Sequence, residues 1–505
     1  MIKTIKNIVL SLAIIALPSL TALSQNARVL WQKNIGGIGY DWVNAITTDS
    51  EDNSYVLSTV QEGDNHEVQV SKLNSDGLVL WTNTIGGDRD ETGADILIDR
   101  DGNIVVTGAS YSKNLASSVK NKGFCDVFVA KISSTGQLLE IASYGGSQID
   151  QPASIIEKSN GHLLVTATSW SEDIDVPNNE GGSDIWTFEL DYDGTILWSK
   201  TEGGSNDEYA VKTILLENDA FITVANTETY AGDYSANHGD QDIVLYHMNA
   251  FGGLNWMQLY GGFQADFASG VARLENGNYL VAGTTFSNDG NVDQNSGGSD
   301  AWIFEVSEGG FLQSSKTYGS DGNESIAELL PLNDGFVVFG TSNSTTLNNA
   351  QNHGNQDFWL YEINAEKEIT DEYLFGASGF DAGYAAALTS NGSILMGGIS
   401  NSSDGLVQTN NGQRDGLLLK INNLNNTSNQ QSTLHPNPTD GVVYLNHLVS
   451  HSKISVVDMN GVQVRMEVEA TSSSKSIDLT NLPSGVYLVK ILHSEGTEIH
   501  RVVLR

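Results

Sequence analysis

The chain has 505 residues, with 62 acidic and 25 basic side chains and a formal net charge of −37. A surface this acidic repels nucleic acids and anionic membranes, which excludes both as partners. Glycine is abundant at 52 residues and proline rare at 7, which favours many short strands with tight turns over disorder. The single cysteine, Cys125, excludes an internal disulfide framework.

Residues 1–24 have the pattern of a secretory signal peptide. Lys3 and Lys6 give a positive start, an apolar run follows, and Ala22 and Ser24 are the small residues expected before a cut. The apolar run is too short to span a bilayer comfortably, and polar sequence follows it at once. We therefore expect export, with no membrane span in the mature chain.

Residues 27–422 repeat one unit seven times, with a period of about 58 residues. Each unit carries a glycine marker followed by four short strand-like segments in the same order. Four antiparallel strands per unit predict an all-β fold, a seven-bladed β-propeller. The markers begin at Gly36, Gly86, Gly145, Gly203, Gly261, Gly319 and Gly376.

The two ends of the repeat region complement each other. The seventh unit stops after its third strand, at residues 415–422, and the chain begins with an orphan fourth strand at residues 28–37. Pairing the two would leave no open sheet edge. We therefore expect the N-terminal strand to close the propeller.

A different domain follows the repeats. Residues 423–433 are polar, lack apolar periodicity and have the composition of a linker. Residues 434–505 contain short alternating strands separated by turn residues. This pattern predicts a small Ig-like β-sandwich.

The last segment resembles the type A sorting domain of type IX secretion, the Por secretion tail. The matching stretches are LHPNPTDG from Leu434, VVDMNGVQV from Val456, IDLTNLPSGVYLVKI from Ile477 and the ending HRVVLR. The resemblance implies the type IX secretion machinery as a partner. It also implies export across both membranes, removal of the domain, and a cargo that is secreted or attached to the outer surface. Where the family often has a lysine near its end, this chain has His500 and Arg501.

Four units carry a tryptophan five residues before the marker, at Trp31, Trp81, Trp198 and Trp256. Some of these turns resemble those of quinoprotein propellers, but the period here is longer and three units lack the tryptophan. We interpret these side chains as packing between blades. No cofactor is expected from them.

Two sets of polar residues are expected on one face of the propeller, the face with the loops between second and third strands. Six of these loops have the pattern Asn-x-Gly-x-x-Asp, and each segment joining two blades carries an acid five residues after the marker. The favoured interpretation is that these side chains tie loops together. The loop sets are Asn121/Gly123/Asp126, Asn179/Gly181/Asp184, Asn237/Gly239/Asp242, Asn295/Gly297/Asp300, Asn352/Gly354/Asp357 and Asn410/Gly412/Asp415, and the face acids are Asp41, Glu91, Asp150, Glu208, Asp266, Glu324 and Asp381.

Calcium is the alternative interpretation of this acidic face, because clustered carboxylates repel one another unless they are neutralised. Asp289, Asn291 and Asp293 alternate as the ligands of hard cations do, and so do Asp173 and Asp175. Neither group has the glycine and distal glutamate of a complete EF-hand loop.

No nucleophile elbow, zinc-protease pair, phosphate loop or dinucleotide fingerprint occurs in the chain, and no catalytic residue is assigned. The favoured function is a secreted or cell-surface module for binding or adhesion to a glycan or protein. The alternative is a secreted carbohydrate-active enzyme, a hydrolase or lyase with carboxylates on the loop-rich face. The uniformity of the units favours binding, since an active site needs asymmetry.

Overall fold

The computed structural model describes residues 27–505, except 333, 346, 348–349, 408–409, 425–432, 436, 440, 447–451, 459–462, 471–473 and 494–495. The predicted signal peptide, residues 1–24, and most of the predicted linker lie outside the described residues. The only helical elements in the described part are two short 3-10 turns, η1 (Glu217–Asp219) and η2 (Gly232–Tyr234). No described helix has the length and apolar character needed to cross a membrane.

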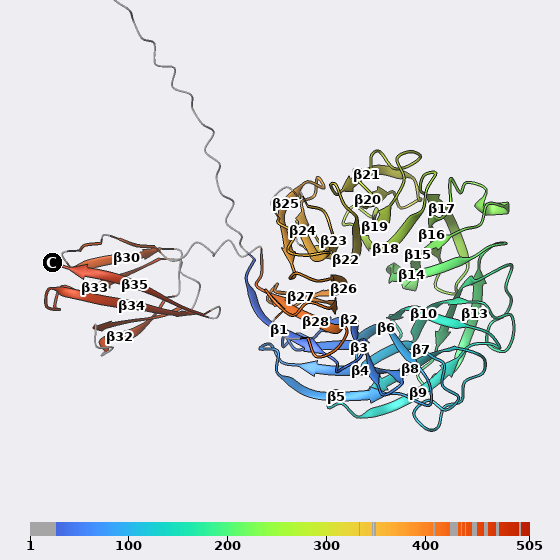
Figure 1. Cartoon of the computed structure of the whole chain (residues 1–505), viewed down its shortest axis with the longest axis horizontal. Helices are drawn as coiled ribbons and strands as arrows, with labels where there is room; N and C mark the ends of the chain where they lie inside the picture. The colour runs from blue at the N-terminus through green and yellow to red at the C-terminus, as the bar shows by residue number, and fades with distance from the viewer. Residues whose placement is uncertain are drawn as a thin grey trace, which may run out of the picture.

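Between Val29 and Ile421, the described residues form seven four-stranded antiparallel sheets. This confirms an all-β, propeller-like fold (Figure 1). Six of the sheets are continuous in sequence: β2 (Trp42–Thr48), β3 (Ser54–Glu62), β4 (Asn65–Leu73) and β5 (Val79–Ile85); β6 (Glu91–Ile98), β7 (Ile104–Ser110), β8 (Asp126–Ile132) and β9 (Leu138–Tyr144); β10 (Asp150–Glu157), β11 (Leu163–Ser169), β12 (Asp184–Leu190) and β13 (Ile196–Glu202); β14 (Glu208–Leu215), β15 (Phe221–Thr227), β16 (Asp242–Met248) and β17 (Leu254–Tyr260); β18 (Asp266–Arg273), β19 (Tyr279–Thr285), β20 (Asp300–Val306) and β21 (Leu312–Tyr318); and β22 (Glu324–Leu332), β23 (Gly335–Ser342), β24 (Asp357–Ile363) and β25 (Ile369–Phe375).

The remaining sheet combines both ends of the repeat region. It contains β26 (Asp381–Leu388), β27 (Ile394–Ser400) and β28 (Asp415–Ile421), and its fourth strand is β1 (Val29–Ile35) from the start of the chain. β1 pairs antiparallel with β28, with Gln32 opposite Leu419. The orphan strand expected at residues 28–37 therefore completes the sheet that lacked one.

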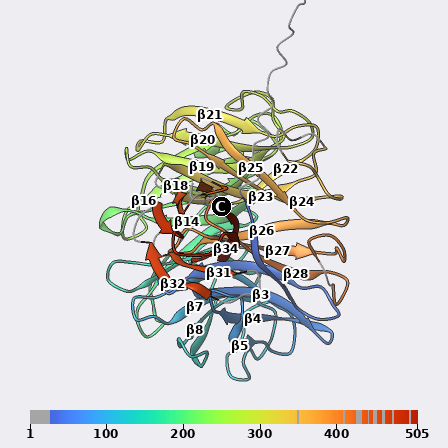
Figure 2. The same ribbon diagram turned by 90° about the vertical axis from the view of Figure 1, so that its left-hand side faces the viewer.

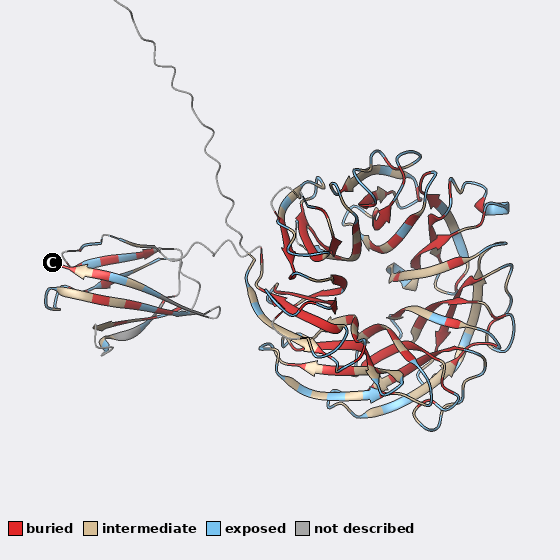
Figure 3. Ribbon diagram, in the orientation of Figure 1, coloured by how far each residue is buried: buried red, intermediate tan, exposed pale blue. Residues whose placement is uncertain are grey.

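In each sheet the first strand lies nearest the common centre and the fourth lies at the periphery (Figure 1). Second and third strands such as β7 and β12 are buried along their whole length, because neighbouring sheets cover both of their faces. Fourth strands such as β5 and β13 are partly exposed (Figure 3). In the side view, β23, β27 and β4, which belong to three successive sheets, follow one another from top to bottom (Figure 2).

Three of the tryptophans that precede the markers bind the next sheet. Trp31 Nε1 donates to Ser75 O at 3.0 Å, Trp81 Nε1 to Ser134 O at 3.0 Å, and Trp256 Nε1 to Glu308 O at 3.1 Å. The turn that receives the ring of Trp81 contains Gly136, where φ is +87° and a Cβ would lie 2.7 Å from the ring. These contacts agree with packing between sheets, as the sequence pattern predicts.

The C-terminal region forms two further antiparallel sheets, with strand orders β29-β30-β33 and β32-β31-β34-β35. Both sheets contribute to one apolar core, which includes Val443 and Leu445 from the first and Val456 and Val489 from the second. β29 begins at Thr433, so the first strand starts one residue before the boundary expected from the sequence. The strands are β29 (Thr433–His435), β30 (Val442–Asn446), β31 (Ser452–Asp458), β32 (Gln463–Ala470), β33 (Ser474–Asp478), β34 (Gly485–His493) and β35 (Gly496–Leu504).

Candidate functional site

The loop face is the end of the sheets that carries the loops between second and third strands and the segments joining successive sheets. At six junctions, the face acid donates its backbone N–H to the residue that precedes the loop aspartate of the neighbouring sheet. This bond brings the two acidic sets together. The pairs, at 2.7–2.9 Å, are Asp41 with Arg414, Asp150 with Cys125, Glu208 with Ser183, Asp266 with Gln241, Glu324 with Ser299 and Asp381 with Gln356.

The seven face acids are buried, with at most 1 % of each residue exposed. Asp381 illustrates their contacts. Its Oδ2 accepts the backbone N–H of Ala377 at 2.9 Å and the hydroxyl of Ser402 at 2.9 Å, and its Oδ1 accepts the hydroxyl of Ser400. Six of the seven face acids accept a hydrogen bond from the segment between marker and acid: Asp41 from Gly37, Asp150 from Gly146, Glu208 from Gly204, Asp266 from Gly262, Glu324 from Ser320 and Asp381 from Ala377.

The Asn-x-Gly-x-x-Asp loops are held by their own side chains. In the last of them, Asn410 Nδ2 donates to Ser400 O at 3.3 Å and Asn410 Oδ1 accepts the N–H of Gly412 at 3.0 Å. Asp415 Oδ2 accepts the N–H of Asn411 at 2.7 Å. The aspartates of the other five loops accept the same backbone bond: Asp126 from Lys122, Asp184 from Glu180, Asp242 from His238, Asp300 from Ser296 and Asp357 from His353.

Five of the seven marker glycines, Gly145, Gly203, Gly261, Gly319 and Gly376, lie against two buried carboxyl groups each. A Cβ on Gly203 would lie 2.1 Å from Asp184 Oδ1 and 2.8 Å from Glu208 Oε2. Asp184 Oδ1 is buried and has no hydrogen-bond partner among the described residues. Burial and, to a smaller extent, the charge of Glu208 together raise the pKa of Asp184 to about 6, against the lowering effect of the hydrogen bond from Glu180. Burial likewise raises the pKa values of Asp126, Asp266 and Asp300 to about 6.

The proposed calcium ligands lie in two equivalent loops and bind backbone there. Asp289 Oδ1 accepts the N–H of Phe263 at 2.7 Å, and Asn291 Oδ1 accepts the N–H of Gly261 at 3.1 Å. Asp293 is exposed.

Asp173 and Asp175 take the corresponding roles in another sheet. Asp173 Oδ1 accepts the N–H of Ser147 at 2.7 Å, and Asp175 Oδ2 accepts the N–H of Gly145 at 3.1 Å. Asp175 also forms an ion pair with Lys122. Within the described part of the chain, no three His, Cys, Asp or Glu side chains gather as a metal site requires.

A second feature of the loop face was not found from the sequence. The residue directly after the second strand donates its N–H to the residue before the face acid, as Tyr111 does to Asp90 O at 3.0 Å. In three sheets this residue is aromatic, and its ring meets a second ring. The ring centroids of Tyr111 and Phe124 lie 5.9 Å apart, those of Trp170 and Tyr209 6.3 Å, and those of Phe286 and Phe267 6.2 Å. A comparison of the seven repeats at the residue after the second strand would have shown that it is aromatic in only three of them.

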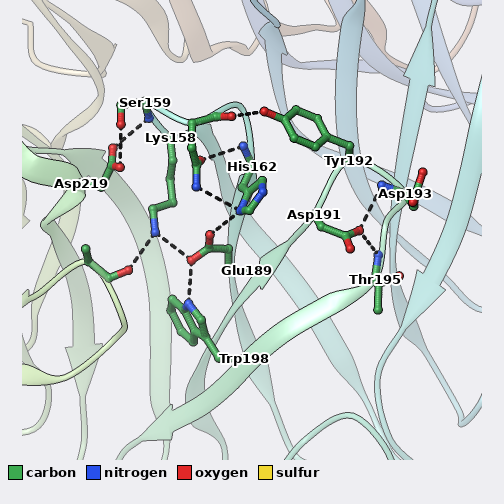
Figure 4. Close-up of polar contacts among 12 residues, drawn as sticks. Lys158, Ser159, His162, Glu189, Asp191, Tyr192, Asp193, Thr195, Trp198 and Asp219 are labelled. Carbon is green, nitrogen blue, oxygen red and sulfur yellow. Dashed lines mark hydrogen bonds and ion pairs between the residues drawn. The ribbon is translucent and has the colours of Figure 1, made fainter.

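The opposite end of the sheets, the turn face, contains a buried polar cluster (Figure 4). Lys158 Nζ lies 2.7 Å from Glu189 Oε2, His162 Nδ1 lies 2.8 Å from Glu189 Oε1, and Trp198 Nε1 donates to Glu189 Oε2 at 2.6 Å. Burial alone would raise the pKa of Glu189, but hydrogen bonds from Lys158, His162 and Trp198 bring it below its usual value.

The first two sheets hold the same contact with the charges exchanged. Asp99 follows the first strand and pairs with Lys131 on the third strand at 3.1 Å, and Asp49 pairs with Lys72 at 3.7 Å. A site that tolerates exchanged charges serves the packing of the sheet, so we assign the cluster no catalytic role.

The turn face also contains grooves between sheets. A cavity of about 550 Å³ lies between the second and third sheets and is lined by Arg100, Tyr144 and Tyr192. A similar cavity of about 470 Å³ lies between the fifth and sixth sheets, with Arg273 and Lys367 in its walls. Their recurrence at equivalent places indicates a feature of sheet packing.

Residues 433–505 match the family described as the secretion system C-terminal sorting domain. No curated protein matches the chain. Among solved structures, the chain is similar to PorZ, a surface component of the type IX secretion system of Porphyromonas gingivalis, with 13 % identity, a TM-score of 0.41, and coverage of 93 % of this chain and 59 % of that one.

Two other solved structures are similar. The extracellular domain of the putative one-component system BT4673 from B. thetaiotaomicron shares 11 % identity, with a TM-score of 0.42 and coverage of 94 % of this chain and 58 % of that one. The polysaccharide lyase Uly1 shares 10 % identity, with a TM-score of 0.45 and coverage of 77 % and 90 %. The chain thus spans less than two thirds of PorZ and of BT4673. The last segment of this protein, residues 433–505, is a C-terminal sorting domain, and the protein is a cargo that type IX secretion exports to the cell surface or beyond.

Proposed function

We propose that this cargo is an extracellular binding module that presents its loop face to a glycan or a protein. The observation that carries the proposal is the state of the seven face acids. All are buried, and six of them bind the backbone of their own segment. Carboxyl groups of a hydrolase or lyase must reach the substrate. These carboxyl groups are occupied in holding the loops, which supports binding over catalysis.

We further infer that residues 27–422 form a seven-bladed propeller that β1 closes. The support comes from the junction between the last and first sheets, where Asp41 N–H donates to Arg414 O at 2.9 Å. This is the bond found at five other junctions. β2 also contacts both β6 and β26, so its neighbours on the two sides are equivalent.

We propose that the C-terminal domain is an Ig-like sandwich whose role is the address alone, with the secretion machinery as its partner. Its core is made from its own two sheets, which supports an independent unit. The ligand of the propeller would then be bound without any contribution from residues 434–505.

The test of the proposed function uses the mature full-length chain on glycan and protein arrays, together with assays for sugar release and unsaturated products. We expect stable retention on at least one ligand with no turnover of it. Turnover of a polysaccharide would contradict the proposal in favour of the enzyme alternative. Absence of retention on both arrays would contradict it as well.

Calcium at Asp289, Asn291 and Asp293, or at Asp173 and Asp175, remains a separate proposal. A structural ion that binds only the folded chain raises its melting temperature as the free ion exceeds its dissociation constant. Melting the mature chain in millimolar calcium and in chelator tests this directly. Equal melting temperatures in the two conditions would exclude structural calcium.

A further inference from the structure

We propose that the aromatic residues of the loop face form a binding site for an uncharged glycan. This inference rests on the proposed binding function and names its ligand class. The site consists of Tyr111, Trp170 and Phe286, the residues directly after the second strands of three sheets, with their ring partners Phe124, Tyr209 and Phe267. We call these six residues the aromatic arc.

The arc replaces residues that hold the loops elsewhere in the repeat. In three other sheets the equivalent side chain is an amide whose oxygen accepts a backbone N–H from the adjoining segment. Asn343 accepts from Asn323 at 2.6 Å, Asn401 from Phe380 at 2.7 Å, and Gln61 from Tyr40 at 3.0 Å. An aromatic ring of Trp or Phe cannot accept this bond. Residues that break a local structural rule without a compensating bond are the ones expected to serve function.

The arc is held by backbone hydrogen bonds, and three of its six rings are exposed to solvent while Tyr111, Trp170 and Tyr209 are half-buried. The N–H of Trp170 donates to Ile149 O at 2.9 Å and that of Phe286 to Ala265 O at 3.0 Å, the same bond that Tyr111 makes. Phe124 is 59 % exposed, and Phe286 and Phe267 are 36 % and 37 % exposed. Because the backbone is already fixed, a ligand that stacks on these rings would order little of the protein on binding.

The chemistry of the arc fits a sugar. One face of a sugar ring is made of C–H groups with partial positive charge, which pack on the negative face of an aromatic ring. Polar groups beside the rings can bind sugar hydroxyls. Gln151 is exposed and its Nε2 lies 3.3 Å from the hydroxyl of Tyr111. Glu228 occupies the equivalent position in the sheet between Trp170 and Phe286.

The acidic residues beside the arc favour uncharged glycans over anionic ones as its ligands. The residues flanking the arc include Asp90, whose side chain is 53 % exposed, as well as Asp207 and Glu228. The chain as a whole carries a net charge of −37. An anionic polysaccharide would approach this face against electrostatic repulsion.

A protein partner fits the arc less well. Protein interfaces have a contiguous apolar centre from which charged residues are largely excluded. Here the ring pairs lie in separate sheets, and Glu228 interrupts the series. Ligands made of repeating units suit such a row of separated rings, because each ring can take one unit.

The experiment is affinity electrophoresis of the mature full-length chain in gels that contain one polysaccharide each. The uncharged probes are laminarin, dextran and xyloglucan, and the anionic probes are alginate and polygalacturonate. The variants are Tyr111→Ala, Trp170→Ala and Phe286→Ala. The matched control is Phe311→Ala, because Phe311 is 68 % exposed in a turn at the opposite end of the sheets.

We expect retention by at least one uncharged probe, with each arc variant weakening it about tenfold. Phe311→Ala should bind like the parent chain, and both Phe311→Ala and Phe286→Ala should keep the parent melting temperature because these two rings are exposed. Stronger retention by the anionic probes, or arc variants that bind like Phe311→Ala, would overturn the proposal. Retention by proteins and by none of the glycans would overturn the glycan site but leave the binding function standing. Retention by neither would overturn both.

Discussion

At the scale of single residues, carboxyl groups occupy the space that a side chain would need at the marker positions, which accounts for glycine there. At Gly376, a Cβ would lie 2.1 Å from Asp357 Oδ1 and 2.9 Å from Asp381 Oδ2. The absence of a side chain therefore lets a loop aspartate and a face acid approach the same point of the backbone. Because φ at Gly376 is not in the left-handed region, the reason for glycine here is space.

We predict that Gly203→Ala destabilises the protein by about 1–3 kcal/mol, the typical effect of inserting a methyl group into a filled site. The new Cβ would lie 2.1 Å from Asp184 Oδ1. The control is Gly270→Ala, because a Cβ there would meet nothing within 4 Å. Denaturant unfolding measures both, and equal stabilities of the two variants would show that the carboxyl group moves aside freely.

The same carboxyl groups predict that the protein is more stable at pH 5 than at pH 7. Burial raises the pKa values of Asp126, Asp184, Asp266 and Asp300 to about 6, whereas an unfolded aspartate has a pKa of about 3.9. The folded chain thus binds protons more tightly. The resulting stability is fully present below about pH 4 and is lost as the pH rises through about 6.

Asp300→Asn separates this effect from the general repulsion of an acidic chain. The amide is neutral at every pH, so the variant should show a flatter dependence of melting temperature on pH between 4 and 7. Carboxyl groups with lowered pKa values, such as Asp49 and Asp99, act at lower pH, since their stabilisation is lost as the pH falls. A melting temperature that rises from pH 5 to pH 7 would contradict the assignment.

At the scale of elements, the strands were predictable because the same strand-like segments recur in the same order in every repeat. The apolar runs of β7, β19 and β27 recur at one spacing after the marker, and all three are buried throughout. The aromatic arc was not predictable by the same reasoning. Repetition identifies what the units share, whereas Tyr111, Trp170 and Phe286 matter because Asn343 and Asn401 stand at their positions in other units.

The polar contacts at the turn face could not be predicted from the sequence pattern either. Lys158 directly follows β10 and Glu189 lies in β12, and their pairing depends on the register of the sheet. In the first two sheets Asp49 and Asp99 take the position of Lys158. Because the acidic and the basic residue have exchanged places, a comparison of residue types between repeats does not reveal that these pairs are equivalent.

We predict that Lys158→Ala destabilises the protein by about 3–5 kcal/mol, because removing one partner leaves a buried charge without compensation. The side chains of Lys158 and Glu189 are only 4 % and 5 % exposed. The control is Glu217→Ala, which removes an 82 % exposed partner of Arg273 and should change stability by less than about 1 kcal/mol. Denaturant unfolding compares the two, and a loss below about 1 kcal/mol for Lys158→Ala would show that His162 and Trp198 suffice.

At the scale of the whole molecule, the two ends of the repeat region meet in one sheet. β28 is buried along its length and contains Leu417, Leu418 and Leu419. Without β1, it would become an unpaired apolar edge. The region just after the predicted signal peptide therefore completes the sheet formed by the end of the repeat region.

We predict that deleting residues 27–37 lowers the melting temperature and causes self-association. Light scattering and thermal unfolding measure the two effects. As a control, removing residues 434–505 should leave the oligomeric state unchanged, since that domain has its own core. A monomeric deletion variant with the parent melting temperature would contradict closure by β1.

If the loop face is the binding surface, a bound ligand should slow the exchange of backbone amides on that face and nowhere else. The measurement is hydrogen exchange of the mature chain with and without the uncharged glycan that retains it best. We expect slower exchange around Tyr111–Phe124, Trp170, Tyr209 and Phe267–Phe286. We expect no change at the turns near Phe251 and Phe311. Protection confined to the turn face would show that the ligand binds elsewhere and that the loop face is not the binding surface.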